Sequence, residues 1–388
     1  MTTTDPEAPR AQGARPRFAT LAVHAAHDVD AETGAIAPPL HLSTTYARDA
    51  ELRLLGEHQY IREGNPTQSQ LERALAPLEG GEAALVLASG MAAAAAVLQS
   101  LEPGSEVVLP DDAYYHMRAI AHDFLPRWGQ RATIVDMSDL GALRAALTPR
   151  TRLVWLESPS NPLLKVVDLA GAIAAARQVG ALTAVDNTFA TPALQRPLEL
   201  GADIVMHSTT KFLGGHSDVQ GGALIFRRRD RLVERVERVR QVLGGVASPF
   251  NSWLVLRGIR TLACRVEAQS RSALAVARAL EGHPAIAAVH YPGLESHPNH
   301  AVARRQMAAF GAILSLRFKG GEAAAKRAVG RMRLFTRATS LGGVESLVEH
   351  RRTSEGAHGT APPELVRLSI GLEHPDDLIA DLQQALEA

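Results

Sequence analysis

A lysine in a polar loop is the residue of this chain best suited to covalent chemistry. Lys211 lies in the stretch 207–216 (HSTTKFLGGH), among hydroxyl side chains and next to a pair of glycines. Only four of the 41 basic residues are lysines, so a lysine kept in such a loop is informative. A primary amine forms an imine with an aldehyde, whereas a guanidinium does not. A solvated surface lysine is the alternative, but the neighbouring hydroxyls and glycines suit a ligand that carries a phosphate.

Three other polar groups follow apolar runs that are expected to be strands. Asp186 follows the run 182–185, Asn161 follows the run 153–156 in a proline-rich turn, and Ser89-Gly90-Met91 follows the run 84–88. The free N–H groups at a helix that starts after Ser89 favour an anion, and a buried aspartate favours a cationic partner. Each group also has a purely structural interpretation, as a helix cap, a loop-stabilising aspartate or a proline turn.

These four groups are expected to meet at one place. In an open parallel sheet, ligands bind beyond the carboxyl ends of the strands, and each of the four groups follows a predicted strand. Together they offer an amine, a carboxylate, an amide and donors for a phosphate. This set matches pyridoxal 5′-phosphate (PLP), which binds a lysine as an imine and pairs its ring nitrogen with an aspartate. The sequence therefore predicts a PLP site.

The elements that position these groups follow a repeating pattern. Short apolar runs alternate with longer Ala-rich helical stretches such as 91–100 and 168–178, which is typical of parallel strands joined by crossover helices. We expect an α/β domain over residues 56–245, built on a seven-stranded, mostly parallel, doubly wound sheet. Its predicted strands are 84–88, 106–109, 132–135, 153–156, 182–185, 203–206 and 222–226.

Two further units flank this predicted domain. Residues 1–55 contain few periodic signals, so they are expected to form an N-terminal arm, with about the first 18 residues disordered, that reaches over a neighbouring subunit. The amphipathic segment 230–243 (DRLVERVERVRQVL) predicts a linking helix with one buried face. Residues 246–388 are expected to form a smaller α+β domain, with strands at 312–317 and 365–370 and a final helix at 376–386.

Composition argues against several other classes of protein. Basic and acidic residues balance at 41 each, without a dense basic block, which gives no electrostatic footprint for nucleic acid or an anionic membrane. The lone Cys264 is incompatible with a disulfide framework and fits a reducing compartment. With neither a signal peptide nor a long apolar segment, we expect a cytoplasmic protein. Pro298 separates His297 from His300, and no carboxylate completes a ligand set, so no metal is expected.

Seven motifs, in this order, resemble those of the transsulfuration (Cys/Met metabolism) family of fold-type I PLP-dependent enzymes. The family includes cystathionine γ-synthase, cystathionine γ- and β-lyases, methionine γ-lyase and O-acylhomoserine sulfhydrylases. The resemblance extends from about residue 18 to the end of the chain. The motifs are 60–67 (YIREGNPT), 88–91 (ASGM), 157–162 (ESPSNP), 186–188 (DNT), 208–211 (STTK), 340–347 (SLGGVESL) and 367–373 (RLSIGLE).

The resemblance implies a role for each matching residue near the reaction centre. Lys211 would bind the cofactor covalently and shuttle protons, and Asp186 would pair with the pyridine nitrogen. Tyr114 would stack on the ring and assist proton transfer. Asn161 would lie beside the ring oxygen and the substrate, and Arg367 with Ser340 would bind the substrate α-carboxylate.

The resemblance also implies a phosphate site that two subunits share. Ser89, Gly90, Met91, Ser208 and Thr210 would hold the cofactor, with the phosphate bound by the last four. Tyr60 and Arg62 resemble a pair that crosses from a neighbouring subunit onto the same phosphate. This predicts a homotetramer, a dimer of dimers with shared active sites, that acts on a small amino-acid substrate.

The activity implied by the resemblance is γ-elimination or γ-replacement on sulfur-containing or O-acylhomoserine-type amino acids, as in cystathionine γ-synthase or γ-lyase. Methionine γ-lyase, cystathionine β-lyase and O-acylhomoserine sulfhydrylase activities are alternatives. A non-catalytic PLP-binding protein is the alternative from another class, and the intact Lys211, Tyr114 and Arg367 argue against it.

The chain departs from the family where the distal end of a substrate would bind. Thr339 stands where many members have a Glu, Tyr115-His116-Met117 replaces a glycine-containing segment, and 350–358 (HRRTSEGAH) replaces a Pro…Thr-His segment. Arg118 is a candidate for the distal end. Recognition of that end therefore stays open.

Overall fold

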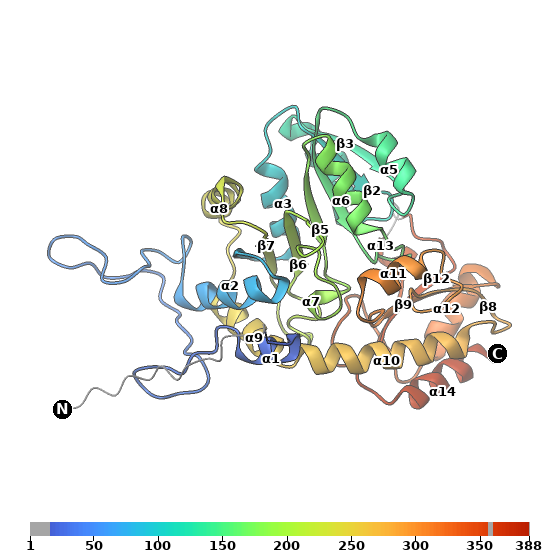
Figure 1. Cartoon of the computed structure of the whole chain (residues 1–388). Coiled ribbons are helices and arrows are strands. Elements are labelled where there is room, and N and C mark those ends of the chain that lie inside the picture. Colours follow the sequence, from blue (N-terminus) through green and yellow to red (C-terminus); the bar gives the residue numbers. More distant parts are fainter. Residues whose placement is uncertain (1–15, 356–359, 388) are drawn as a thin grey trace.

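A seven-stranded sheet forms the centre of the computed structural model, which describes residues 16–355 and 360–387 (Figure 1). The strand order is β1-β7-β6-β5-β4-β2-β3, and β7 alone runs antiparallel to its neighbours. The predicted α/β class and mostly parallel sheet are confirmed, and each predicted run is a strand. The strands are β1 (Ala83–Leu87), β2 (Glu106–Pro110), β3 (Arg131–Val135), β4 (Thr151–Glu157), β5 (Leu182–Asp186), β6 (Ile204–Ser208) and β7 (Gly222–Phe226).

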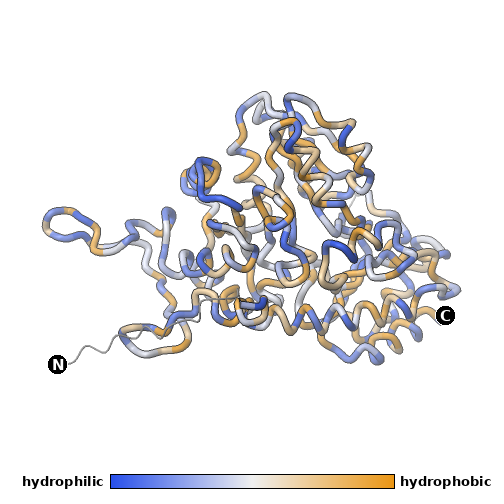
Figure 2. The backbone as a smooth tube through the Cα atoms, viewed as in Figure 1, coloured by the Kyte–Doolittle hydropathy of each residue, from blue (hydrophilic) through white to orange (hydrophobic). Residues whose placement is uncertain are grey.

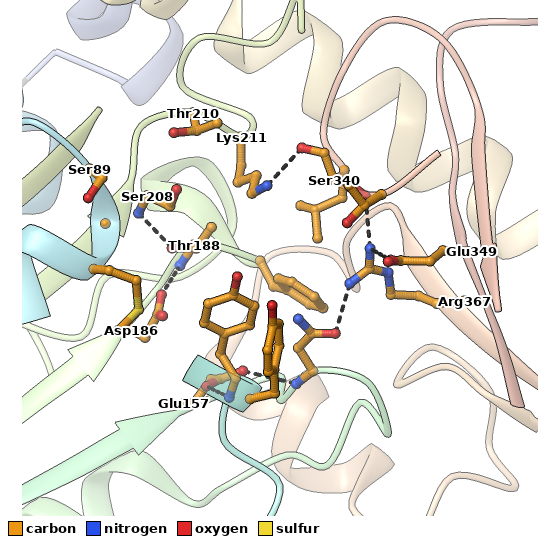
Figure 3. Close-up of a pocket in the computed structure, with 18 of the residues that line it drawn as sticks. Ser89, Glu157, Asp186, Thr188, Ser208, Thr210, Lys211, Ser340, Glu349 and Arg367 are labelled. Carbon is orange, nitrogen blue, oxygen red and sulfur yellow. Dashed lines mark hydrogen bonds and ion pairs between the residues drawn. The ribbon is translucent and has the colours of Figure 1, made fainter. Parts of the chain in front are cut away.

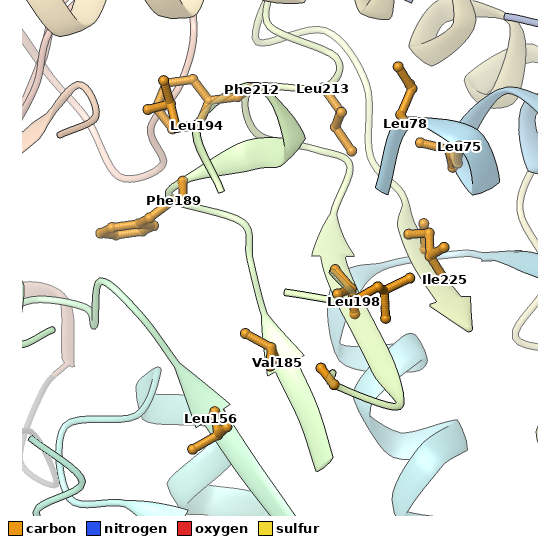
Figure 4. Packing of buried hydrophobic residues seen from close by; sticks show 14 of the residues in the cluster. Leu75, Leu78, Leu156, Val185, Phe189, Leu194, Leu198, Phe212, Leu213 and Ile225 are labelled. Atoms are coloured by element: carbon orange, nitrogen blue, oxygen red, sulfur yellow. The ribbon is translucent and has the colours of Figure 1, made fainter. Parts of the chain in front are cut away.

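Helices cover both faces of this sheet, which is why its strands are apolar at successive positions. Alternate side chains of a strand point to opposite faces, and in β4 Val154 and Leu156 join one hydrophobic cluster while Leu153 and Trp155 join the other. Figure 4 shows part of the first cluster. The first face packs on α2 (Pro66–Glu79), α5 (Leu140–Ala146), α6 (Leu169–Gln178) and α9 (Pro249–Ile259), and the second on α3 (Gly90–Gln99), α4 (Tyr115–Ala119) and α8 (Arg231–Leu243).

Helix α8 confirms the predicted amphipathic segment, and it is mostly hydrophilic in Figure 2. Val233 and Val236 are buried against the sheet. The buried face of the helix is shorter than the pattern predicted, because Val242 is 55% exposed at the end of the helix. The next helix is α9, and the long α10 (Leu262–Leu280) then leads into the C-terminal part of the chain.

The C-terminal part contains a second sheet of five strands, in the order β10-β11-β12-β9-β8. Its two predicted strands and the predicted final helix are present as β9, β12 and α14. Its elements are β8 (Ile286–His290), α11 (His300–Gln306), β9 (Ile313–Phe318), α12 (Gly321–Arg331), β10 (Thr336–Arg337), β11 (Leu347–His350), α13 (Arg351–Glu355), β12 (Leu365–Ser369) and α14 (Pro375–Leu386).

The pleat of this second sheet decides which side chains face the first sheet. On β12, Val366 and Leu368 pack into a cluster with α10, α12 and α14, so Arg367 between them points to the opposite face. In the register, Arg367 lies between Glu349 of β11 and Ser315 of β9. A row of buried polar groups therefore runs across the face that meets the large sheet.

The N-terminal segment extends away from the body of the molecule between about residues 26 and 60 (Figure 1). Several apolar side chains on it are exposed, among them Ile36, Leu42 and Leu52. The predicted arm is interrupted by α1 (Phe18–His24), a helix that we did not expect, which buries Ala22 in the core. The predicted disorder falls mostly outside the described residues. The predicted domain boundaries at 55 and 245 stay predictions.

The short helical segments complete the inventory of elements. They are α7 (Thr191–Leu194), the π-helical turn η1 (Ile120–Phe124) and the 3₁₀ turn η2 (Pro126–Trp128). Within residues 16–355 and 360–387, no helix combines the length and the apolar character that crossing a membrane requires.

Candidate active site

A cavity of about 370 Å³ lies where the carboxyl ends of β4, β5 and β6 face the polar row of the small sheet (Figure 3). The structure brings together every predicted site residue except Tyr60 and Arg62. The predicted residues that line the cavity are Ser89, Gly90, Met91, Tyr114, Asn161, Asp186, Ser208, Thr210, Lys211, Ser340 and Arg367.

Lys211 lies in the turn that follows β6, and its amine reaches across the cavity. Nζ donates a hydrogen bond to Ser340 Oγ at 2.7 Å, so the amine touches the segment before the small sheet's β11. Burial lowers the pKa of Lys211 to about 8, and the positive charge of Arg367 acts in the same direction. A low pKa keeps part of the amine neutral, which is the form that attacks an aldehyde or takes a proton.

The turn is held by Arg265, a residue that sequence reasoning missed. Its guanidinium donates to the carbonyls of Phe212 at 2.9 Å and Gly258 at 2.8 Å, from a position that is 4% exposed. Gly215 has φ +76°, and a Cβ there would lie 2.2 Å from this guanidinium. Glycine at this position therefore makes room for the Arg265 side chain. An arginine within a long helix carries no local signal for such a contact.

The pKa of Lys211 gives a pH-dependent prediction for cofactor binding. Since only the neutral amine attacks an aldehyde, the rate at which the apoprotein takes up PLP should rise as the pH passes through about 8 and level off above it. An ordinary lysine, with a pKa of about 10.4, would still be gaining rate at pH 10. Stopped-flow absorbance in the visible range measures this rate. A rate that climbs without a plateau to pH 10 would contradict the assignment.

Asp186 ends β5 in a partly buried position at the floor of the cavity (Figure 3). Its Oδ1 accepts the backbone N–H of Thr188 at 3.0 Å, which is the loop-stabilising role that we considered as an alternative. Burial raises the pKa of Asp186, and the bonds from Thr188 oppose that rise only in part. A cationic ligand group beside this carboxylate would offset its desolvation. The protonated ring nitrogen of PLP is such a group.

The start of α3 forms the other end of the cavity. Ser89 Oγ accepts the N–H of Ala92 at 3.1 Å and so caps the helix, while the first N–H groups of the helix have no acceptor within it. A Cβ at Gly90 would lie 2.9 Å from Ser208 Cβ, so glycine lets the hydroxyl of Ser208 approach this end. Helix N–H groups beside hydroxyls are suited to a phosphate. The donors present therefore fit the phosphate of PLP.

Arg367 occupies the opposite wall of the cavity and is 3% exposed. Its Nη1 donates to Asn161 Oδ1 at 2.9 Å, and its Nη2 donates to the carbonyl of Ser340 at 2.8 Å and pairs with Glu349. Burial lowers the pKa of Arg367 to about 10, which leaves the guanidinium charged at neutral pH. A buried, charged guanidinium fork is suited to a substrate carboxylate.

Several residues that line the wall around Arg367 were not predicted. Arg351 pairs with Glu349 at 2.9 Å and with Glu355 at 3.0 Å, and Glu349 and Arg351 both line the cavity. Thr339 also lines it. Arg118 is our candidate for the distal end of a substrate. Its Nη2 lies 3.5 Å from Oε2 of Glu355. Arg351 and Glu355 lie in the stretch 350–358 that departs from the family, whereas Glu349 gave no signal, and the pairing of these residues depends on the tertiary structure.

Tyr114 lies at the start of α4 and faces the cavity. Its Oη is 3.0 Å from Nδ1 of His116, and burial raises the pKa of Tyr114. The ring also contacts Tyr115 edge to face, with centroids 5.2 Å apart. An aromatic ring beside Asp186 and Asn161 is available to stack on a planar ligand.

Tyr60 and Arg62 lie on the extended arm and are not among the described residues that line the cavity. Tyr60 is 42% exposed, and the Arg62 guanidinium lies 5.5 Å from the centre of its ring. Arg62 Nη1 donates to the carbonyl of Gln241 at 2.8 Å, near the end of α8. Their predicted role on the phosphate of a neighbouring subunit stays a prediction.

Known proteins resemble this chain over nearly its whole length. The chain is 46% identical to a cystathionine gamma-synthase of Mycobacterium tuberculosis, and 95% of this chain and 96% of that protein are covered. It is 42% identical to a cystathionine beta-lyase of Coxiella burnetii (95% and 97% covered) and to an L-methionine gamma-lyase of Pseudomonas putida (96% and 98%). The structure of cystathionine gamma synthase from Xanthomonas oryzae pv. oryzae in complex with cystathionine matches with a TM-score of 0.92 at 43% identity, covering 96% of this chain and 98% of that one.

The fold, the cavity and these similarities define a PLP-dependent enzyme of fold type I. The family model for Cys/Met metabolism PLP-dependent enzymes matches residues 19–387. The chain belongs to this family of PLP-dependent enzymes of cysteine and methionine metabolism, which confirms the family and the cofactor predicted from the sequence. The relatives carry three different activity names, so family membership leaves the individual reaction to be proposed.

Proposed function

We propose that the enzyme catalyses γ-elimination or γ-replacement on homoserine-derived or thioether amino acids, in the manner of a cystathionine γ-synthase or γ-lyase. The observation that carries the proposal is the position of Lys211 relative to Arg367. Ser340 accepts from Lys211 through its hydroxyl and from Arg367 through its carbonyl, so both reactive groups contact one residue. An amino acid bound by its carboxylate at Arg367 would thus have its Cα close to the Lys211 amine.

The chain's own groups would divide the work as follows. Bound PLP supplies an electron-withdrawing ring that stabilises negative charge on the substrate. Asp186 would hold a proton at the ring nitrogen, and Tyr114 would pack on the ring face. Arg367 would bind and orient the α-carboxylate, and Lys211 Nζ would take the proton from Cα and move it onward, which its lowered pKa favours.

The preference for chemistry at the γ-carbon rests on similarity. A γ-synthase is among the relatives of highest identity, and one γ-synthase structure was determined with cystathionine. The amino-acid substrate follows from the family and from the Arg367 clamp. Neutral Thr339 at the cavity wall offers no charge to the distal ammonium of cystathionine, so it argues against a strict cystathionine assignment.

We further propose that the active site is shared between subunits. The extended arm carries exposed apolar side chains together with Tyr60 and Arg62, and such a segment is suited to cover a neighbouring chain. In this arrangement Tyr60 and Arg62 would bind the phosphate held at the start of a partner's α3. The proposed assembly is a homotetramer, built as a dimer of dimers.

Product identification tests the proposed reaction. The purified holoenzyme is supplied separately with cystathionine, with methionine, and with an O-acylhomoserine plus cysteine, and the products are identified by mass spectrometry. We expect 2-oxobutyrate from cystathionine, or new cystathionine from the O-acylhomoserine. Pyruvate from cystathionine would overturn the γ preference in favour of a β-lyase. Turnover of methionine alone would assign a methionine γ-lyase, and no turnover of any substrate would favour the non-catalytic alternative.

A further inference from the structure

Glu157 is a buried carboxylate in the cavity to which neither the sequence nor the proposed reaction gives a role. It ends β4, is 4% exposed and lines the cavity (Figure 3). Its Oε2 accepts the backbone N–H of Tyr114 at 2.9 Å, and its Oε1 accepts the backbone N–H of Asn161, also at 2.9 Å. Both oxygens are thus committed to the backbone of residues that line the cavity.

The two bonded residues come from different loops. Tyr114 follows β2, whereas Asn161 lies in the turn after β4, and these strands are neighbours in the sheet. Burial and the neighbouring Asp186 raise the pKa of Glu157 well above its usual value, whereas the bonds from the two N–H groups favour its ionised form. A single side chain therefore fixes the distance between the ring that faces the ligand and the amide beside it.

Two further hydrogen bonds link Asn161 to the side of the cavity where the substrate carboxylate would bind. Asn161 Oδ1 accepts from Arg367 Nη1 at 2.9 Å, and Arg367 Nη2 donates to the Ser340 carbonyl at 2.8 Å. A displacement of the Asn161 backbone would thus move an acceptor of the carboxylate clamp. Glu157 itself would not touch cofactor or substrate, but it bonds two residues that would.

Glu157 also lies directly beside Asp186. The two residues are register partners on β4 and β5, and strands in a sheet are about 4.8 Å apart. Tyr114, Asn161 and Asp186 are the three groups proposed to contact the cofactor ring, and Glu157 contacts or adjoins all three.

We infer that Glu157 is a positioning residue, which holds Tyr114 and Asn161 in register with Asp186 so that all three meet the cofactor ring together. The inference rests on the proposed roles of those three residues. It deepens the proposed function because it names what sets their geometry. Glu157 itself touches neither reacting atom nor substrate in this role.

The Glu157→Gln variant tests the inference directly. The amide has one oxygen that can accept an N–H, and it presents its NH₂ group to the other donor, so one buried N–H loses its partner. We expect the dissociation constant of PLP, measured by fluorescence titration of the apoprotein, to rise about tenfold or more. The visible circular dichroism of the bound cofactor should weaken, since it reports the orientation of the ring. An unchanged dissociation constant together with an unchanged spectrum would overturn the inference.

Glu157→Asp separates position from charge. It keeps the carboxylate but is shorter by one methylene, so it cannot reach both loops at once. Positioning predicts weaker PLP binding and a changed spectrum for this variant too. A role through charge alone predicts wild-type behaviour for Glu157→Asp and a defect for Glu157→Gln only, and that result would also overturn the inference.

A matched control is Glu106→Gln. Glu106 begins β2, the strand beside β4, so it lies at the amino ends of the strands, away from the cavity, where it accepts hydrogen bonds from Thr133 and Thr148. The same chemical change at this partly buried carboxylate should leave PLP affinity and the visible spectrum at wild-type values. A defect equal to that of Glu157→Gln would show a general effect of losing a hydrogen-bonded carboxylate from the sheet and overturn the inference.

Hydrogen exchange of the wild-type holoenzyme provides a test that needs no variant. The amides of Tyr114 and Asn161 lie outside strands, yet both should exchange slowly because Glu157 accepts them. Rapid exchange of both amides would overturn the inference. A wild-type protein that binds no PLP would instead refute the proposed function, so the two failures are distinguishable.

Discussion

Replacing Lys211 with alanine should abolish covalent attachment of PLP and lower turnover by roughly 10³-fold or more, since both imine formation and proton transfer at Cα are assigned to this amine. The reconstituted variant should lack the visible absorption of the attached cofactor. Borohydride reduction of the wild type, followed by peptide mapping, should place the label on the peptide that contains Lys211.

Lys326→Ala is the matched control for this experiment. Lys326 pairs with Glu322 on the surface of α12, and its side chain is 53% exposed, so its loss should change stability little and cofactor attachment not at all. A label that maps to Lys326, Lys165 or Lys319 in the wild type, or visible absorption retained in Lys211→Ala, would show that the attachment site is elsewhere.

The second large effect is expected for Asp186→Asn. A neutral amide cannot pair with a protonated ring nitrogen, and removing one member of a buried ion pair costs about 3–5 kcal/mol, or roughly 10²- to 4 × 10³-fold in PLP affinity. Turnover should fall with it. The dissociation constant of PLP, measured by fluorescence titration, is the direct readout, and a value within about threefold of the wild type would contradict the assignment.

The same substitution should act in the opposite direction on the apoprotein. Burial raises the pKa of Asp186, so the folded state disfavours its ionised form, and at neutral pH this carboxylate destabilises the fold without its ligand. Asp186→Asn should therefore leave the free energy of unfolding in urea unchanged or increase it. Asp203→Asn is the control, for which we expect the opposite results for stability and for PLP affinity. Asp203 pairs with Arg227 at 2.7 Å before β6, so its loss should lower stability and leave PLP affinity intact.

The sequence predicted the large sheet well because each strand is a compact apolar run followed by a polar strand end. Lys211, Asp186 and Asn161 could be placed together for the same reason, since parallel strands bring their carboxyl ends to one edge. Arg367 was identified from a motif, and the alternation along β12 then explains why it faces the cavity while Val366 and Leu368 face the helices.

Other parts of the site had no local signal. Glu157 occupies a position that reads as the polar end of a strand, and only the meeting of two loops gives it two backbone donors. Arg265 lies in the first turn of a long helix of ordinary pattern, and its contact with the Lys211 turn depends on how α10 crosses the molecule. The unexpected α1 is only 7 residues long, too short for a reliable periodic pattern, and its stability comes from packing on the core.

The cavity has one wall on each sheet, and the hydrogen bonds from Lys211 to Ser340 and from Asn161 to Arg367 span it. The groups proposed to hold the cofactor belong mainly to one wall, and the carboxylate clamp belongs to the other. We therefore expect that a small shift of one wall against the other, as in dilute urea, abolishes turnover while PLP stays attached and its visible absorption is retained.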